Sequence, residues 1–258
     1  MNRELNLTAK TLGRPSFYLE SVDSTNRWMK ENGASLPHGA VCWTGFQTAG
    51  RGRLGRSWQT GNGDSLAMSI LFKPGFNSSL LPLVCGLGVS KALQKLTSKE
   101  FLIKWPNDII CEGHKVCGIL CENMVNPSGG FAVAGIGINL LQSERDFKSA
   151  GLPHAGSLKM FCGEIPNIAK IAAEVINCIE PLWMEFAEKG FGSIKREYES
   201  KCLTLKKEVN VLSVSGRLIC SGYAAGISDD GSLLVDSGNG PEPVNAGEVS
   251  VRTSNGYI

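Results

Sequence analysis

Apolar residues gather in short runs through the first half of the chain, and most of these runs have the length of a buried strand. Gly, Pro, Asn and Asp residues separate the runs, as is typical of turns between strands. The predicted strands are 40–46, 66–72, 101–105, 115–122 and 131–140. This part of the chain is therefore expected to be mostly sheet.

Other stretches repeat their apolar residues at helical spacing. Ser24 and its polar neighbours precede a short helix that ends at Gly33, and Pro82 begins a helix that continues to Leu96. A longer helix is predicted over 167–189, where Pro181 predicts a kink or break, and a shorter one over 193–202.

The pattern changes after about Leu205. Four short segments with the character of strands follow, at 209–214, 218–225, 232–236 and 248–252. Turn signals separate them, and we expect a loop over 238–243. We therefore predict two domains, 1–205 and 206–258, the second a small antiparallel barrel.

Composition limits the class of protein. The chain has 258 residues, with 26 Lys and Arg against 24 Asp and Glu, so its formal charge is only +2. The nine cysteines form no C-x-x-C pair and there are three histidines, which favours reduced thiols over disulfides or a zinc site. No apolar stretch approaches the length of a membrane span and residues 1–16 lack a signal-peptide core. We expect a soluble cytoplasmic protein, although organellar import stays open.

Positive charge is concentrated in one glycine-rich segment, 50–58, with the sequence GRGRLGRSW. Glycines let backbone N–H groups converge on an anion, and arginines supply forked donors for phosphate or carboxylate. Trp58 adds a flat surface for a ring. The alternative interpretation is a solvated basic loop or a nucleic-acid contact, which the small net charge disfavours.

Three further segments place polar residues at the ends of predicted strands. They are K-W-P-N-D at 104–108, K-x-x-G-I-L-x-E at 115–122 and G-I-G-I-N-L at 135–140. Taken singly, each has a structural explanation: a tight turn, a strand bulge at Gly118, or a strand with one face free of side chains.

In this order, the four segments and Ser24-Thr25-Asn26 resemble the biotin–protein ligase family, and the likeness extends to the last predicted strand. The resemblance implies an α+β catalytic domain with a mixed sheet, like that of class II aminoacyl-tRNA synthetases, followed by a small SH3-like barrel. It also implies two steps. Biotin and ATP form biotinyl-5′-AMP and pyrophosphate, and a lysine of a biotin carboxyl-carrier domain then takes the biotinyl group and releases AMP.

The family's biotin site implies a set of contacts in this chain. Polar groups for the ureido ring would come from Ser24, Thr25, Asn26 and Gln47, with backbone help from Gly50 and Arg51. The floor and wall of the pocket would be Gly118, Leu120, Gly135 and Gly137, with Lys115 near the carboxylate.

The family's nucleotide site implies a second set. Arg53 would hold the biotin carboxylate and then the adenylate phosphate, Arg56 would lie near the ATP phosphates, and Trp58 would pack on the adenine. Lys104 and Lys115 would neutralise charge, with Arg53 and Asp108 as further catalytic candidates. The remaining nucleotide contacts would be Asn107, Asn139 and, with a weaker signal, Arg252.

Some assignments stay open. Asp108 would orient the acceptor lysine, act as a base or bind Mg²⁺, the metal that the family implies. The chain would be a monomer or homodimer that binds neither membrane nor nucleic acid. Because only 23 residues precede Ser24, we expect no DNA-binding domain and no repressor activity. The alternatives are a lipoate or octanoate ligase of the same superfamily and a non-enzymatic nucleic-acid-binding module.

Overall fold

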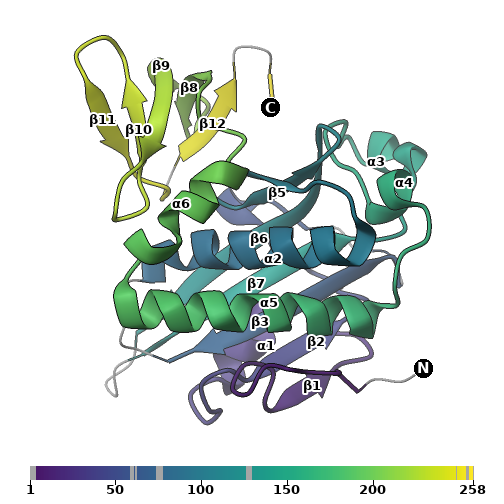
Figure 1. The fold of residues 1–258 in the computed structure, drawn as a ribbon. Coiled ribbons are helices and arrows are strands. Elements are labelled where there is room, and N and C mark those ends of the chain that lie inside the picture. The colour runs from purple at the N-terminus through teal and green to yellow at the C-terminus, as the bar shows by residue number, and fades with distance from the viewer. Residues whose placement is uncertain are drawn as a thin grey trace.

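The computed structural model describes residues 4–58, 61, 63–73, 78–125, 130–247, 249–253 and 256–257. A seven-stranded sheet carries helices on its faces, and a smaller sheet lies beside one end of it (Figure 1). The α+β prediction is confirmed. Among the described helices, none combines the length and apolar content needed to cross a bilayer.

The larger sheet is built almost entirely from antiparallel pairs. Its strands are β1 (Ser16–Tyr18), β2 (Val41–Thr44), β3 (Ser65–Phe72), β4 (Leu102–Lys104), β5 (Asp108–Cys111), β6 (His114–Met124) and β7 (Phe131–Asn139). Their order is β1-β2-β3-β7-β6-β5-β4, with β1 parallel to β2. This order places β6 and β7, which carry two of the chemical motifs, side by side in the sheet interior.

Helices cover both faces of this sheet. They are α1 (Thr25–Asn32), α2 (Leu81–Thr97), α3 (Glu144–Ser149), α4 (Leu158–Cys162), α5 (Ile168–Lys189) and α6 (Gly192–Lys201). One apolar cluster joins α2 and α5 to one face, and a second packs Met29 of α1 against Leu71 and Val133 on the other. Gly88 lets α2 approach α5 closely, since a Cβ there would lie 2.5 Å from Ile179.

The structure differs from two expectations for these regions. Helix α5 passes through Pro181 without a break, because Ile179 and Leu182 on either side of the proline are buried in the core. The expected loop at 238–243 contains the start of strand β11 (Pro241–Val244). Four short elements, β1, β5, α3 and α4, were not predicted because so few residues carry no clear periodicity.

The C-terminal region forms an antiparallel sheet in the order β11-β10-β9-β8-β12. Its other strands are β8 (Glu208–Ser213), β9 (Leu218–Ile227), β10 (Leu233–Asp236) and β12 (Val249–Thr253). Glu248, the first residue of the predicted last strand, lies outside the described residues. We call residues 206–257 the C-terminal sheet domain.

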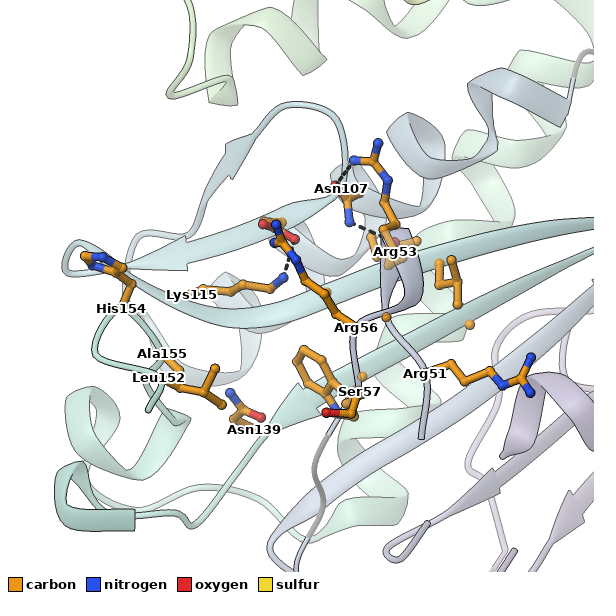
Figure 2. A pocket seen from close by; sticks show the side chains of 18 of the residues that line it. Arg51, Arg53, Arg56, Ser57, Asn107, Lys115, Asn139, Leu152, His154 and Ala155 are labelled. Atoms are coloured by element: carbon orange, nitrogen blue, oxygen red, sulfur yellow. Dashed lines mark hydrogen bonds and ion pairs between the residues drawn. The ribbon is translucent and has the colours of Figure 1, made fainter. Parts of the chain in front are cut away.

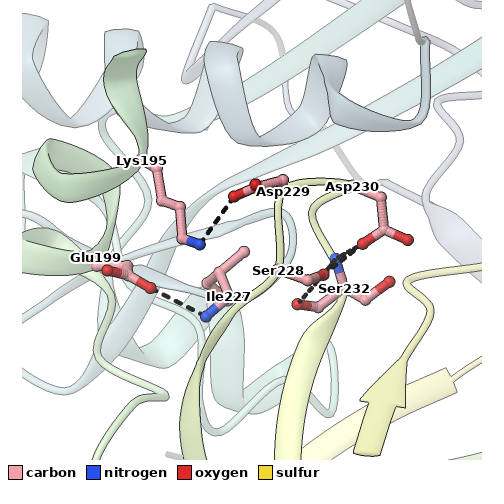
Figure 3. A network of polar contacts seen from close by, with 7 residues as sticks. All are labelled: Lys195, Glu199, Ile227, Ser228, Asp229, Asp230 and Ser232. Atoms are coloured by element: carbon pink, nitrogen blue, oxygen red, sulfur yellow. Dashed lines mark hydrogen bonds and ion pairs between the residues drawn. The ribbon is translucent and has the colours of Figure 1, made fainter. Parts of the chain in front are cut away.

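Polar contacts fix this domain against α6 through the turn between β9 and β10 (Figure 3). Lys195 pairs with Asp229 at 3.0 Å, and the Glu199 carboxylate accepts the backbone N–H of Ile227 at 3.0 Å. The same turn reaches the 104–108 segment, where the Trp105 indole N–H donates to the Gly231 carbonyl at 3.0 Å. The C-terminal sheet domain is therefore bonded directly to one of the chemical motifs.

A buried carboxylate anchors the N-terminal segment to α5. Glu180 accepts the backbone N–H groups of Lys10, Thr11 and Leu12 at 2.5 to 2.7 Å. Burial by itself raises the pKa of this carboxyl, but the three hydrogen bonds outweigh it and the pKa is lowered. The carboxylate therefore contributes stability above the pKa of the unfolded chain, near 4.3, and loses it as pH falls.

Glu180→Gln should lower the free energy of unfolding by about 1–3 kcal/mol at pH 7, because an amide offers one acceptor where three donors converge. The deficit should shrink below about pH 4, as wild-type Glu180 becomes protonated. Urea unfolding at both pH values measures it, with exposed Glu188→Gln on the same helix as control. An equal deficit at both pH values would contradict the anchoring role of the charge.

Candidate functional site

A cavity of about 570 Å³ lies where the seven-stranded sheet, the loop 50–58 and the C-terminal sheet domain meet (Figure 2). With the exception of Gly50, every site residue expected from the sequence lines this one cavity. Residues that lie as far apart in the chain as Ser24 and Arg252 are therefore brought to one place. Residues 150–155 and Tyr257 also line it and were not anticipated.

One end of the cavity is formed by a buried polar network at the start of α1. Ser24 caps the helix. The Gln47 side-chain oxygen accepts the backbone N–H of Thr25 at 2.8 Å and its hydroxyl at 3.2 Å. The Ser69 hydroxyl of β3 lies 2.8 Å from the Thr25 hydroxyl. The sequence offered one signal for Ser69, a hydroxyl within the apolar run 66–72.

Asn26 is fixed by partners on both sides of its amide. Its oxygen accepts from Ser69 at 2.6 Å, and its nitrogen donates to the Leu120 carbonyl at 3.2 Å and to Glu122 at 2.8 Å. Lys30 pairs with Glu122 at 2.6 Å. Burial raises the pKa of Glu122, but hydrogen bonds from Lys30 and Asn26 outweigh it, so the pKa is lowered and the carboxylate stays charged. Glu122 ends the K-x-x-G-I-L-x-E motif but was not predicted as a site residue.

The glycines of β6 and β7 make room for two side chains that shape the cavity. A Cβ on Gly135 would lie 2.1 Å from the Asn26 oxygen, and one on Gly137 would lie 2.5 Å from the Trp58 ring. A Cβ on Gly118 would lie 3.1 Å from the same ring. The Trp58 ring N–H is buried and has no hydrogen-bond partner among the described residues. Asn26 and Trp58 therefore pack against the face of β7 that carries Gly135 and Gly137, which we call the glycine face of β7.

The loop 50–58 folds back on itself as a tight turn. The backbone N–H of Trp58 donates to the Gly50 carbonyl at 2.9 Å, and that of Gly52 donates to the Arg56 carbonyl at 2.7 Å. Leu54 and Gly55 take positive φ values of 59° and 72° at the tip. Gly50 itself lies beneath the Trp58 backbone, where a Cβ would come within 2.4 Å of the Trp58 carbonyl. It shapes the loop from outside the cavity.

The three arginines of this loop have different surroundings. Arg53 donates to the Asn107 side chain at 2.7 Å and, from its other terminal nitrogen, to the carbonyls of Ala246 and Gly247, the latter at 3.2 Å. It therefore joins the loop to the C-terminal sheet domain. Arg51 is exposed and points away from Arg53 and Lys115 (Figure 2), while Arg56 is exposed at the cavity wall.

The opposite end of the cavity holds the cationic groups of the 104–108 turn and β6. Asp108 pairs with Lys115 at 2.6 Å through one oxygen and accepts the Tyr257 hydroxyl at 2.5 Å through the other. Burial raises the pKa of Asp108, but Lys115 and Lys104 outweigh it and the pKa is lowered. Lys104 is 7% exposed, and its burial lowers its pKa to about 8 despite the nearby Asp108 charge.

Asn107 and Asn139 brace the cavity wall. Asn107 donates to the Ile119 carbonyl at 3.0 Å, and Asn139 donates to the Gly156 carbonyl at 3.0 Å. The Arg252 guanidinium lies over the Tyr257 ring, 4.7 Å from its centre. Tyr257 follows the last motif, so no sequence signal indicated it.

The residues around Asp108 do not provide a protein-built magnesium site. Mg²⁺ is usually held by one or two carboxylates together with substrate phosphates. One oxygen of Asp108 accepts the Tyr257 hydroxyl, and the other lies 2.6 Å from the Lys115 ammonium as an ion pair, without the geometry of a hydrogen bond. Within the described residues, no three His, Cys, Asp or Glu side chains are grouped so as to hold a metal ion. The contacts of Asp108 favour a role in positioning Lys115 over a role as metal ligand.

Comparison with known proteins covers both parts of the chain. Residues 18–139 match the model of the biotin/lipoate A/B protein ligase family, and residues 204–252 match that of the biotin protein ligase C terminal domain. A solved structure of biotin protein ligase from Aquifex aeolicus, in complex with biotin and ATP, is similar to 93% of this chain and 99% of its own. The two share 34% sequence identity, with a TM-score of 0.81.

Curated relatives agree with this assignment. The bifunctional ligase/repressor BirA of Bacillus subtilis is 28% identical over 250 residues, which span 95% of this chain and 76% of BirA. The biotin–[acetyl-CoA-carboxylase] ligase of Mycobacterium tuberculosis is 30% identical over 218 residues, 82% of this chain and 78% of that protein. With its catalytic and C-terminal regions both matched, and its motifs gathered in one cavity, this chain belongs to the biotin protein ligase family.

Proposed function

We propose that the protein activates biotin with ATP and transfers the biotinyl group to a lysine of a biotin carboxyl-carrier domain. The observation that carries the proposal is one cavity with a buried polar network at one end and a group of cations at the other. An acid with a polar ring and a carboxylate tail, joined to a nucleotide phosphate, matches this arrangement in charge and polarity.

The polar end favours biotin over lipoate. The ureido group of biotin has two N–H donors and a carbonyl acceptor, whereas the dithiolane ring of lipoate has no comparable hydrogen-bonding groups. Thr25, Asn26 and Gln47 are all buried at this end and border the cavity, so they suit a ligand that forms hydrogen bonds.

The cationic end suits adenylation. In the first step a biotin carboxylate oxygen attacks the α-phosphorus of ATP, and the bond to the departing pyrophosphate breaks. Negative charge develops on phosphate oxygens, where fixed cations stabilise the transition state. Lys104, Lys115 and Arg56 are assigned this role, and Arg252 is assigned to the outer phosphates.

The second step transfers the acyl group. The neutral amine of the acceptor lysine attacks the acyl carbon of biotinyl-5′-AMP, and the bond from that carbon to the phosphate oxygen breaks. AMP leaves with the electron pair, and the nitrogen loses one proton to solvent as the amide forms. Asp108 is assigned to hold Lys115 in place during both steps. Trp58 is assigned to the adenine ring and Asn139 to the nucleotide, because both line the cavity next to the glycine face of β7.

The test is incubation of the protein with biotin, ATP, magnesium salt and a purified biotin carboxyl-carrier domain, followed by intact-mass spectrometry of the acceptor. We expect one biotinyl group on the acceptor and none when its target lysine is replaced by arginine. Parallel reactions contain lipoate or octanoate with a lipoyl domain. Transfer of lipoate or octanoate without transfer of biotin would overturn the proposal.

Arg53→Ala should impair retention of the adenylate more than folding. The guanidinium joins the loop to Asn107 and the C-terminal sheet domain, but loop arginines contribute little core burial. We expect biotinyl-5′-AMP to dissociate about tenfold faster or more, as for loss of a charged hydrogen bond. Rapid gel filtration of the labelled intermediate measures this. A variant that unfolds easily yet retains the adenylate normally would make Arg53 purely structural.

Lys104 should make the activity of the enzyme fall at alkaline pH. Because burial lowers its pKa to about 8, the free enzyme loses this charge as pH rises through that value. We expect kcat/KM for ATP to fall with a midpoint near pH 8, since this ratio reports groups of the free enzyme. Lys104→Arg should move this fall to higher pH, and an unchanged midpoint would contradict the assignment.

The same shift predicts the sign of a stability effect. Between pH 8 and 10.5 the unfolded chain holds a proton on Lys104 that the folded chain lacks. The Lys104 contribution to the unfolding free energy should therefore rise with pH across this window.

A further inference from the structure

Tyr257 lies close to the end of β12. The backbone N–H of Gly256 donates to the Thr253 carbonyl at 3.1 Å. Tyr257 lines the same cavity as the family motifs. The C-terminal sheet domain therefore contributes an aromatic side chain to the catalytic end of the cavity.

The Tyr257 ring is held by groups from three other segments. It stacks on the His154 ring, with 5.1 Å between centres and 8° between planes. Lys104 lies 4.1 Å from the ring centre, and the Arg252 guanidinium lies 4.7 Å from it. Cations so close to an aromatic face are attracted by its electrons. The ring thus fixes where two cations of the site lie.

The Tyr257 hydroxyl contacts the Asp108–Lys115 pair at the cationic end of the cavity. It donates to one oxygen of Asp108 at 2.5 Å, while the other oxygen pairs with the Lys115 ammonium at 2.6 Å. The three side chains form one chain of contacts from the C-terminal sheet domain to β6. The hydrogen bond from Tyr257 restrains the Asp108 carboxylate, and its other oxygen faces the Lys115 ammonium as an ion pair. The hydroxyl therefore helps to determine where Asp108 holds Lys115.

The hydroxyl has no role that packing alone would require. A phenylalanine ring has the same shape, so it would stack on His154 and lie under the two cations equally well. A hydroxyl taken out of water costs free energy unless it is paired, and here its partner is a charged carboxylate. The contact therefore serves the Asp108–Lys115 pair.

We propose that Tyr257 is a positioning residue for adenylation, acting through Asp108 to set the Lys115 ammonium at the biotin carboxylate and α-phosphate. This inference rests on the proposed function of the cavity and adds to it a residue outside the four motifs. It also gives the C-terminal sheet domain a direct part in the first chemical step.

The first test compares Tyr257→Phe with wild type in biotin-dependent pyrophosphate release. Loss of a hydrogen bond to a charged group corresponds to about a tenfold or greater loss of rate. We expect that loss in kcat, with the KM for biotin within twofold of wild type. Tyr223→Phe on the exposed part of β9 is the matched control and should keep wild-type kinetics.

A double-mutant cycle separates positioning from simple structural support. Tyr257→Phe is made in wild type and in Asp108→Asn, and single-turnover formation of biotinyl-5′-AMP is followed by mass spectrometry. If Tyr257 acts through Asp108, the phenylalanine change should cost less than twofold in the Asp108→Asn background. An equal loss in both backgrounds, or wild-type kcat for Tyr257→Phe, would overturn the proposal.

Wild-type enzyme assayed alongside tests the proposed function, because its inactivity with biotin would contradict that function and not the role of Tyr257.

Discussion

Lys115→Ala should reduce the rate of biotinyl-5′-AMP formation by about 10²–10³-fold, the loss typical when one preorganised donor to a developing oxyanion is removed. Lys115 is the cation that Asp108 holds at 2.6 Å on the glycine-containing strand β6. Single-turnover formation of the adenylate, followed by mass spectrometry, measures the effect. Lys99→Ala is the matched control, because its pair with Glu112 is exposed on both sides and should contribute little.

Stability must be separated from catalysis in this variant. Removing Lys115 leaves the Asp108 carboxylate buried without its ion-pair partner, and breaking a buried pair costs about 3–5 kcal/mol. The double variant Lys115→Ala with Asp108→Asn removes that charge, so its unfolding free energy should recover while adenylation stays slow. A double variant that regains near wild-type adenylation would show that Lys115 acts only through stability.

Gly135→Ala should weaken biotin binding by about a hundredfold. The added Cβ would lie 2.1 Å from the Asn26 oxygen. Asn26 cannot move aside without losing its bonds to Ser69 and Glu122. Two lost hydrogen bonds at a buried site amount to about 2–3 kcal/mol, which corresponds to the stated change in Kd.

Isothermal titration with biotin measures this effect. Gly192→Ala is the control, because a Cβ at Gly192 meets nothing within 4 Å and the residue begins α6 away from the cavity. Gly192→Ala should bind biotin as wild type does. If Gly135→Ala also bound biotin within twofold of wild type, Asn26 would not form part of the biotin site.

The main strands and helices were predictable because each has a regular apolar pattern. The runs at 66–72 and 131–140 became β3 and β7, and the period over 167–189 became α5. A kink or break was predicted at Pro181, and the helix continues through it without a break because core packing on both sides outweighs one missing backbone hydrogen bond. Short elements such as β1 and α4 were not predicted, because a strand or helix of so few residues is stabilised by tertiary contacts.

The site was predictable to a similar degree. Motif residues such as Asn26, Trp58 and Lys115 were assigned to one pocket, and the structure places them around one cavity. Ser69 and Tyr257 were not assigned, because one hydroxyl within an apolar run is a weak signal and Tyr257 lies beyond the last motif. The contacts of Arg53 with the C-terminal sheet domain also had no sequence signal, since they join residues about 190 positions apart.

By itself, the sequence determined the class of fold, the chemical character of each motif and the resemblance to biotin–protein ligases, because these depend on residue type and local spacing. Only the tertiary structure decided which groups touch. In the structure, Asn26 and Trp58 pack over the glycines of β7. Asp108 pairs with Lys115, and Tyr257 contacts Asp108. Contacts between distant segments depend on strand order and domain packing, and local sequence does not encode them one residue at a time.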